Sequence, residues 1–331
     1  MNLYISNSSA VNDGPRHQWT NELMNNSQSS SHILMIRPIN FGFNEETAES
    51  NAFQNRDAKA DDANTKAQQE FDGMVNTLRT NGVDVTVIDD TPEPYTPDSI
   101  FPNNWVSLHA DGEVYLYPMQ AENRRLERRE DIIAKLEDRF SVKRVIDLSR
   151  FEEEGKFLEG TGSMVLDREN KIAYACISPR TDRDVLSIFC EHAGYKPVTF
   201  DAVDEKGQAI YHTNVLMCVG SGFAVICFDC IPNPYEKLVV AESLASTQKE
   251  IIGISFEQMN DFAGNMLEVK SNAGDTLIVM SQSAFDALFE EQKVILKKYG
   301  KLVHADIGTI ETIGGGSARC MMAEVHLPLN S

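Results

Sequence analysis

The sequence repeats one pattern five times, and this repetition constrains the fold more than any other feature. Each unit contains a helix-like segment, a short strand, a loop of small or polar residues and a second apolar strand. The residues that open this second strand recur at intervals of 51 to 58 residues: Asn104, Gly162, Asn214, Asn265 and Cys320. The length of 331 residues alone suggests two domains. Five units of similar length, each with strands and a helix, instead predict one α/β repeat structure that closes on itself.

The chain divides into a polar N-terminal segment and a structured remainder. Residues 1–31 are rich in Asn and Ser without sustained periodicity, so we predict a flexible tail over 1–31 and a single domain over 32–331. The run from His32 to Arg37 predicts a short buried strand that stops before Pro38. Residues 44–67 are acidic and contain Asn and Ala throughout, which predicts a loop leading into a helix.

Composition excludes several classes of partner. The chain has 30 basic and 50 acidic residues, and its net charge of −20 repels phosphate backbones and anionic membrane surfaces. No apolar run reaches the roughly 18 residues of a membrane span, and no basic stretch followed by an apolar one suggests a secretion signal. We therefore expect a cytoplasmic protein that binds neither nucleic acid nor membranes.

The six cysteines are sparse for this length and lie mostly in apolar runs, as expected for buried thiols in a reducing compartment. Cys227 and Cys230 form a C-x-x-C pair, but no second pair and no His pair stands at the spacing of zinc ligands. A metal or redox role for this pair is the minor alternative. Cys320 differs from the others because it opens one of the five repeated strands.

Repetition around an axis brings equivalent loops to one place, so the polar residues in these loops are expected to converge. The loops supply Asp98, Asn103, Asn104, Glu159, His212, Asn214, Asn265 and Cys320. A thiol, an imidazole and a carboxylate brought together in this way are what a Cys–His–Glu catalytic group needs. Taken singly, each has an ordinary alternative: a buried strand cysteine, a structural histidine and a glutamate in a surface turn.

Five ordered motifs carry a resemblance to known enzymes. They are MIRPINFGFN, PDSIFPNNW, FLEGTGSMVLD, YHTNV and GGGSARCMMAEVHLP, between about residue 33 and residue 328. Together they resemble the guanidino-group modifying superfamily of arginine deiminases, dimethylargininases and amidinotransferases, and most closely its citrulline-utilisation hydrolase group. The resemblance implies a five-bladed α/β propeller, or pentein, of ββαβ units with pseudo-five-fold symmetry. It also implies a catalytic domain over residues 32–331 that needs no metal or organic cofactor.

The resemblance assigns roles to three of the converging residues. Cys320 is the expected nucleophile, His212 the general acid and base, and Glu159 the group that orients the imidazole. A thiol with its ordinary pKa of about 8.5 is mostly protonated at neutral pH, so it needs a cation or the substrate nearby to become a thiolate. The glycines at 314–316 let the backbone before Cys320 fold tightly, which suits a close approach to a substrate.

Arginines are the expected partners for the carboxylate of an amino-acid substrate, because the guanidinium fork binds a carboxylate through two hydrogen bonds. Arg180 in SPRTDRD resembles a dimethylargininase motif with this role. The run ENRRLERRE resembles a second such region, which would supply Arg124 or Arg125, although a solvated charged helix face explains the run equally well. Arg37 is a third, weaker candidate.

Amides stand where relatives that act on guanidinium groups carry acids. Asp98 is retained, but Asn103, Asn104 and Asn214 replace carboxylates. A guanidinium group consists only of donors and is charged, whereas a neutral ureido group has a carbonyl oxygen that needs a donor. The amides therefore favour a ureido substrate such as citrulline. The alternative is that Asn was selected for loop geometry.

The expected reaction is hydrolysis of citrulline to ornithine, carbon dioxide and ammonia through an S-carbamoyl enzyme. Arginine deimination, dimethylarginine hydrolysis and amidine transfer use the same three groups and remain alternatives. A binding propeller without activity is an alternative from another class, but it predicts a basic face, which the net charge of −20 opposes. The expected partner is a small amino acid, and the chain could also form a homodimer.

Overall fold

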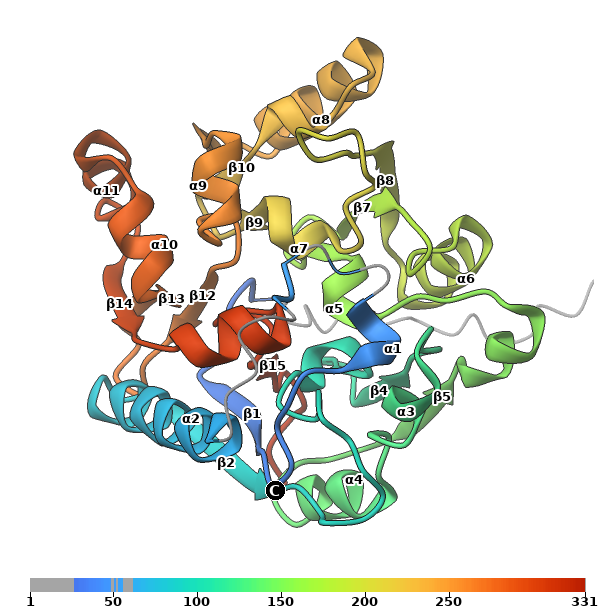
Figure 1. The fold of residues 1–331 in the computed structure, drawn as a ribbon. Helices are drawn as coiled ribbons and strands as arrows, with labels where there is room; N and C mark the ends of the chain where they lie inside the picture. Colours follow the sequence, from blue (N-terminus) through green and yellow to red (C-terminus); the bar gives the residue numbers. More distant parts are fainter. Residues whose placement is uncertain (1–26, 49–50, 52, 56–61, 331) are drawn as a thin grey trace, which may run out of the picture.

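The computed structural model describes residues 27–48, 51, 53–55 and 62–330, which form a ring of five three-stranded sheets (Figure 1). In every sheet the middle strand pairs antiparallel with the inner strand and parallel with the outer strand. A parallel pair needs a crossover connection, and a helix supplies it in each unit. The predicted five-bladed α/β propeller is confirmed.

The blades share one order of elements: inner strand, middle strand, helical crossover and outer strand. The first contains β3 (Val106–Leu108), β4 (Glu113–Leu116), α3 (Glu122–Arg125), α4 (Glu130–Glu137) and β5 (Arg144–Asp147). The second contains β6 (Val165–Asp167), β7 (Ile172–Ile177), α6 (Arg183–Ala193) and β8 (Lys196–Asp201). The third contains β9 (Met217–Val219), β10 (Phe223–Ile226), α8 (Pro234–Ser246) and β11 (Glu250–Gly253).

The last two blades follow the same order, and the fifth closes the ring. The fourth contains β12 (Leu267–Lys270), β13 (Thr276–Ser281), α10 (Gln282–Ala287), α11 (Glu290–Leu296) and β14 (Lys301–Ala305). The fifth contains β15 (Ala323–Glu324), β1 (His32–Arg37), α2 (Ala63–Thr80) and β2 (Asp84–Asp89). Because β15 pairs with β1, strands from near the two ends of the described chain complete one sheet.

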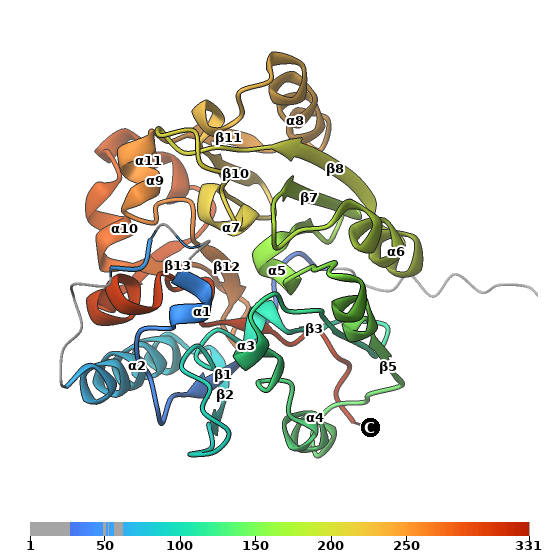
Figure 2. The ribbon, with the colours of Figure 1, turned by 45° about the vertical axis from the view of Figure 1, so that its right-hand side comes forward.

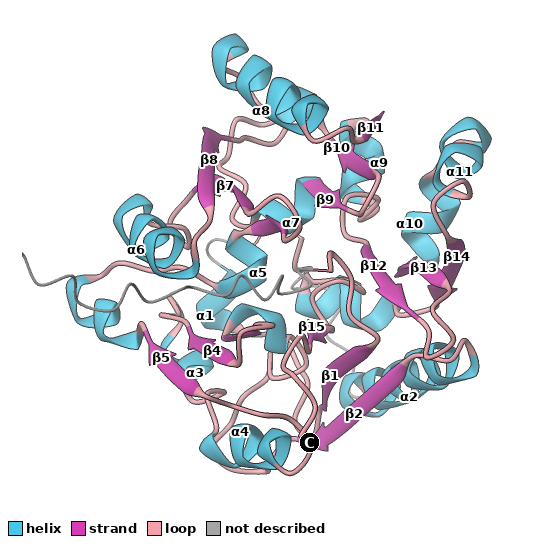
Figure 3. Cartoon of the chain, turned by 180° about the vertical axis from the view of Figure 1, so that it is seen from behind, coloured by secondary structure: helices cyan, strands magenta, loops and turns pink. Residues whose placement is uncertain are grey.

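Helices occupy two different places in the ring. The long crossover helices α2, α4, α6, α8 and α11 lie on the rim (Figure 3). Short helices lie toward the centre: α1 (Glu45–Ala48), α5 (Gly160–Ser163) and α7 (Thr213–Leu216), with α5 and α7 side by side (Figure 2). Further short turns are η2 (Pro102–Asn104), η3 (Ser149–Glu154), η4 (Phe228–Cys230), α9 (Phe256–Asn260) and η5 (Ile310–Gly314).

Apolar faces hold the rim helices against the sheets. In α2 the fully buried side chains Ala67, Phe71, Met74 and Leu78 recur at intervals of three or four residues, so one face of the helix is apolar. They pack in one cluster with Ile33 of β1. Each large apolar side chain that is buried contributes on the order of 2 kcal/mol to folding. The rim helices thus pack on the outside of the ring. The loops before the inner strands lie on its inside and build the centre.

The N-terminal boundary differs from the prediction. Gln28, Ser29 and Ser30 were predicted to belong to the tail, but they are buried in the ring. The Nε2 of Gln28 donates to the carbonyl oxygens of Leu166 and Val219, which lie in two different blades. Hydrogen bonds therefore bury this polar segment, which hydrophobic patterning does not reveal. The rest of the predicted tail, residues 1–26, lies outside the described residues.

The predicted helix after the acidic loop begins at Ala63, and the short helix α1 was not anticipated. All six cysteines are free and buried. Among the described residues, no group of three or more His, Cys, Asp or Glu side chains could hold a metal ion. In the same part of the chain no helix has the length and apolar character needed to cross a bilayer.

Candidate active site

The loops before the five inner strands meet at the centre of the ring, as the repeat predicts. The Nδ2 atoms of Asn214 and Asn265 both lie 3.4 Å from Cys320 Sγ. A Cβ atom on Gly162 would lie 2.5 Å from Asn104 Nδ2, so these two loops also touch. Asn104 and Cys320 line one cavity. The five residues that open the repeated strands therefore surround one site.

His212 and Glu159 form the predicted pair. His212 Nε2 lies 2.8 Å from Glu159 Oε2, and both side chains are buried. Burial lowers the pKa of His212 to about 4, with Glu159 opposing the shift, so the imidazole is neutral at pH 7. Because the Nε2 proton is bonded to the carboxylate, Nδ1 is the nitrogen left to accept a proton. This tautomer suits a general base.

Glu159 is ionised although it is completely buried. Its Oε1 accepts a hydrogen bond from the backbone N–H of Gln120 at 3.0 Å, and Arg180 Nη1 lies 3.5 Å from its Oε2. Burial alone would raise its pKa, but Arg180 and His212 outweigh burial and lower the pKa to about 2. A charged carboxylate in this position holds the imidazole ring in one orientation and stabilises it when it is protonated.

Cys320 is 5% exposed and lies after the glycine-rich turn. The two amide N–H groups from Asn214 and Asn265 point at its sulfur. Gly315 has φ +67, and a Cβ atom on Gly316 would lie 2.9 Å from the Phe101 ring. Close approach of the backbone to the site therefore requires glycine at these positions.

The cavity at Cys320 is small, with a volume of about 20 Å³. This is room for a single water molecule. Its lining comprises Thr47, Asn51, Asp98, Phe101, Asn104, Arg124, Arg180, Tyr211, His212, Gly314, Gly315, Gly316 and Cys320.

Two buried oxygens at the site have no hydrogen-bond partner among the described residues: Asp98 Oδ1 and Asn214 Oδ1. The other oxygen of Asp98 accepts from Asn44 Nδ2 at 2.8 Å and from Thr47 Oγ1 at 3.2 Å. A buried acceptor without a partner costs about 1–3 kcal/mol. These oxygens therefore mark positions where N–H donors of a ligand would bind.

Comparison with known proteins places this chain in a family of enzymes. A family profile described as "N,N dimethylarginine dimethylhydrolase, eukaryotic" matches residues 37–327. The chain belongs to this family. It is accordingly a hydrolase of C–N bonds, as the motifs predicted at the level of enzyme class. No curated protein sequence matches the chain.

Solved structures share the fold. The apo structure of ArgZ, an arginine dihydrolase from the ornithine–ammonia cycle in cyanobacteria, matches with a TM-score of 0.71 and 18% identity over 90% of this chain and 41% of ArgZ. The substrate-bound N-terminal domain of ArgZ matches with a TM-score of 0.70 and 18% identity, over 90% of this chain and 98% of the domain. A dimethylarginine dimethylaminohydrolase variant was solved as an adduct with S-methyl-L-thiocitrulline. It matches with a TM-score of 0.62 and 18% identity, over 88% of this chain and 98% of the variant.

In this dimethylargininase-family chain, the two buried arginines of the cavity are bonded to protein groups. Arg124 binds both oxygens of Glu127 at 2.9 Å and donates from Nη1 to Asn104 Oδ1 at 2.8 Å. Burial raises the pKa of Glu127 to about 7. Arg180 donates to the carbonyl of Thr47 at 2.9 Å. Both arginines orient neighbouring groups, and their binding of a substrate carboxylate stays a prediction.

Among the predicted residues, Glu159, Asn214 and Asn265 contact His212 or Cys320 without lining the cavity, and three others are bonded elsewhere. Of the adjacent arginines, Arg124 rather than Arg125 faces the site, because Arg125 donates to the carbonyls of residues 119 and 120. Arg37 pairs with the exposed carboxylate of Asp72 at 2.8 Å. Asn103 lies behind Asn104 and donates to Thr161 Oγ1 at 3.3 Å. Asn103 thus supports the lining without forming it.

Several lining residues were not anticipated from the sequence. Tyr211 donates its hydroxyl to the carbonyl of Gly315 at 2.7 Å, and the Arg180 guanidinium lies 4.8 Å from its ring centre. Thr47 and Asn51 come from the segment around α1. The position of Tyr211 directly before His212 was a signal that could have revealed it. Thr47 and Asn51 have no equivalent in the other repeats and carry no such signal.

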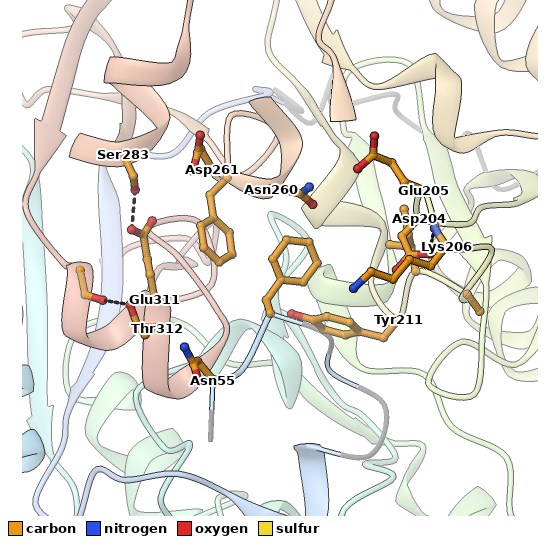
Figure 4. A pocket seen from close by; sticks show the side chains of 15 residues that line it. Asn55, Asp204, Glu205, Lys206, Tyr211, Asn260, Asp261, Ser283, Glu311 and Thr312 are labelled. Carbon is orange, nitrogen blue, oxygen red and sulfur yellow. Dashed lines mark hydrogen bonds between the residues drawn. The ribbon is translucent and has the colours of Figure 1, made fainter. Parts of the chain in front are cut away.

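A larger cavity of about 610 Å³ adjoins the site, and Tyr211 lines both (Figure 4). The aromatic rings of Phe53 and Phe262 form part of its wall. Its charged side chains are mainly acidic: Asp204, Glu205, Asp261 and Glu311, with Lys206 as the single cation that the described residues contribute. An acidic wall of this kind attracts cations.

Proposed function

We propose that the chain hydrolyses citrulline to ornithine, carbon dioxide and ammonia. The observation that carries this proposal is a pair of amides where carboxylates would suit a guanidinium ion: Asn104, which lines the cavity, and Asn214, whose Nδ2 lies 3.4 Å from Cys320 Sγ. Their N–H groups can donate to a ureido oxygen. The unpartnered oxygens of Asp98 and Asn214 can accept from the ureido nitrogens. A ureido group needs this mixture of donors and acceptors.

The buried charges support a neutral group at this position. The carboxylates of Asp98, Glu159 and Glu127 are offset by the guanidinium groups of Arg124 and Arg180. Because the pKa of Glu127 is raised to about 7, its charge is only partly present at neutral pH. The cluster therefore has a small net charge, and a neutral ureido group leaves little charge uncompensated.

The reaction balances with the groups at hand. The Cys320 sulfur attacks the ureido carbon while His212 Nδ1 takes the thiol proton, and His212 then passes this proton to the departing ornithine nitrogen. Asn104 and Asn214 hold the ureido oxygen as it gains negative charge. Water, deprotonated by His212, hydrolyses the S-carbamoyl enzyme to carbamate and regenerates the thiol. Carbamate then decomposes to carbon dioxide and ammonia.

Arginine or a methylated arginine is the second candidate substrate. The acidic wall of the outer cavity favours a cation on its way to Cys320, and the unpartnered Asp98 Oδ1 suits a guanidinium donor. The similar fold of ArgZ, described as an arginine dihydrolase, is compatible with this alternative. In that reaction the covalent intermediate is an amidino rather than a carbamoyl thioester.

The deciding experiment incubates the protein separately with citrulline, arginine and dimethylarginine and identifies the amine released. Our proposal expects ornithine from citrulline, with a carbamoyl adduct on Cys320 when the reaction is quenched and analysed by mass spectrometry. Release of dimethylamine from dimethylarginine, or of ammonia and citrulline from arginine, with no turnover of citrulline, would instead establish guanidine hydrolysis.

A further inference from the structure

The inner strands have a second end, and polar residues gather there too. His109 follows β3, Arg168 follows β6 and His326 follows β15. Since the catalytic loops precede these strands, and a strand rises about 3.3 Å per residue, the three residues lie on the far side of the ring from Cys320, on the order of 10 Å away. A cavity of about 240 Å³ lies there, lined by these residues together with Asp111, Lys171 and His192.

The charges at this cavity are mainly positive. Arg168 is 5% exposed, and its Nε lies 3.5 Å from Glu324 Oε1. The same carboxylate also binds Arg319 Nη2 at 3.1 Å, so one negative charge is shared between two guanidinium groups. Lys171 makes no ion pair among the described residues, and its Nζ lies 4.6 Å from the Tyr195 ring centre. Of the described residues, Asp111 is the only carboxylate that lines the cavity.

One histidine, His109, adds a further polar group to this surface. His109 is 4% exposed, and its Nε2 bonds to Ser107 Oγ at 2.7 Å. Within the described part of the chain its Nδ1 has no hydrogen-bond partner, although the ring lines the cavity. The hydroxyl of Ser107 can donate to Nε2, because Tyr117 can in turn donate to Ser107, and Nδ1 then carries the proton. In this tautomer the Nδ1–H of His109 is available to an acceptor in the cavity.

We propose that this far-side cavity binds a small oxyanion of about phosphate size. Arg168, Lys171 and the Nδ1–H of His109 are the donors that oxyanions select, and two of them bring positive charge to a partly desolvated position. The net charge of −20 repels anions from the molecule as a whole. An anion is therefore attracted only where cations are locally in excess, as they are at this cavity. Phosphate and a small dicarboxylate share this chemistry.

Isothermal titration of the full chain with inorganic phosphate, and separately with malonate, tests this site. We expect saturable binding of at least one of the two, and the tighter of them identifies the oxyanion class. Lys171→Gln is expected to weaken the binding about tenfold, because it removes a cation from the cavity. Lys135→Gln, which removes the same charge from the exposed side of α4, is the matched control and should bind as the wild type does.

Arg168→Gln provides a second variant, with thermal unfolding recorded to confirm that it folds. Absence of saturable binding of both anions to the wild-type protein overturns the proposal. An equal loss of affinity in Lys171→Gln and Lys135→Gln also overturns it, since net charge rather than the cavity would then determine the binding. An unchanged affinity in Lys171→Gln places the anion elsewhere and has the same consequence.

Discussion

The two ends of the inner strands carry opposite chemistry. Before the strands, short helices and glycine turns bring a thiol, amides and carboxylates to a cavity with room for one water. After the strands, Arg168, Lys171 and three histidines surround a cavity about ten times larger. Both ends arise from the same five repeats, so the fold determines only where side chains converge. The residues in the loops determine what each end can bind.

The largest expected effect separates the two ends by function. Cys320→Ser should reduce turnover of the best substrate by about 10³-fold or more, because a serine hydroxyl is a far weaker nucleophile here. The same variant should keep the wild-type affinity of the far-side cavity for phosphate or malonate. Steady-state kinetics and titration calorimetry on one preparation measure both. A parallel loss of anion binding would show that the oxyanion had been at Cys320.

Glycine provides the next test, because the two ends need it for different reasons. Gly162→Ala should lower kcat about 10²-fold, since its Cβ would lie 2.7 Å from His212 Nδ1 and displace the ring. Gly274 lies in the turn after β12, has φ +91 and has open space around a Cβ atom. Gly274→Ala should therefore cost about 1 kcal/mol of stability and leave kcat unchanged.

Kinetics and denaturant unfolding of the two glycine variants distinguish crowding from backbone strain. A normal kcat in Gly162→Ala would mean that the catalytic end tolerates displacement of His212. The position of the imidazole would then not be set by the contact between these loops.

The repeats made the centre predictable from sequence, but not the direction of each side chain. Their period located Asn104, Gly162, Asn214, Asn265 and Cys320 in one site, because equivalent loops of a closed ring have to converge. Period alone cannot tell which of two adjacent residues points inward, since successive helical residues point about 100° apart. Arg124 and Arg125 on α3 illustrate this limit.

Parts of the site that lie outside the repeats were not predictable for a different reason. Asn44 and Thr47 reach Asp98 from a segment that has no counterpart in the other blades. Gln28 is buried through hydrogen bonds to two blades, whereas sequence patterns detect burial mainly through apolar residues. Long-range polar contacts of this kind depend on the completed ring.

A smaller effect tests why the catalytic end carries amides. Asn214→Asp should raise the ratio of kcat/KM for arginine over citrulline about tenfold, because a carboxylate suits a guanidinium ion and repels a ureido oxygen. Asn265→Asp is the matched control. Asn265 lies at the same distance from Cys320 Sγ, but its Oδ1 already accepts from the backbone N–H of Arg319. It should slow both substrates equally, and a ratio unchanged in Asn214→Asp would remove the amide argument for citrulline.

The smallest expected effect concerns a property that the two ends share. Burial lowers the pKa of His212 at one end and of His326 at the other to about 4, below the ordinary value of 6.5. The unfolded chain therefore binds a proton below pH 6.5 that the folded chain does not. The resulting stability is present above pH 6.5 and is lost as the pH falls toward 4.

Between pH 6.5 and 5, each of these histidines should contribute up to about 1.4 kcal/mol per pH unit to the decline in unfolding free energy. Glu159 and Glu324 add little in this window, because their lowered pKa values place their effect near and below pH 4.5. Urea unfolding across the window should show a shallower decline in His212→Gln and in His326→Gln, by similar amounts. A slope reduced in only one variant would mean that burial keeps the imidazole neutral at one end and not at the other.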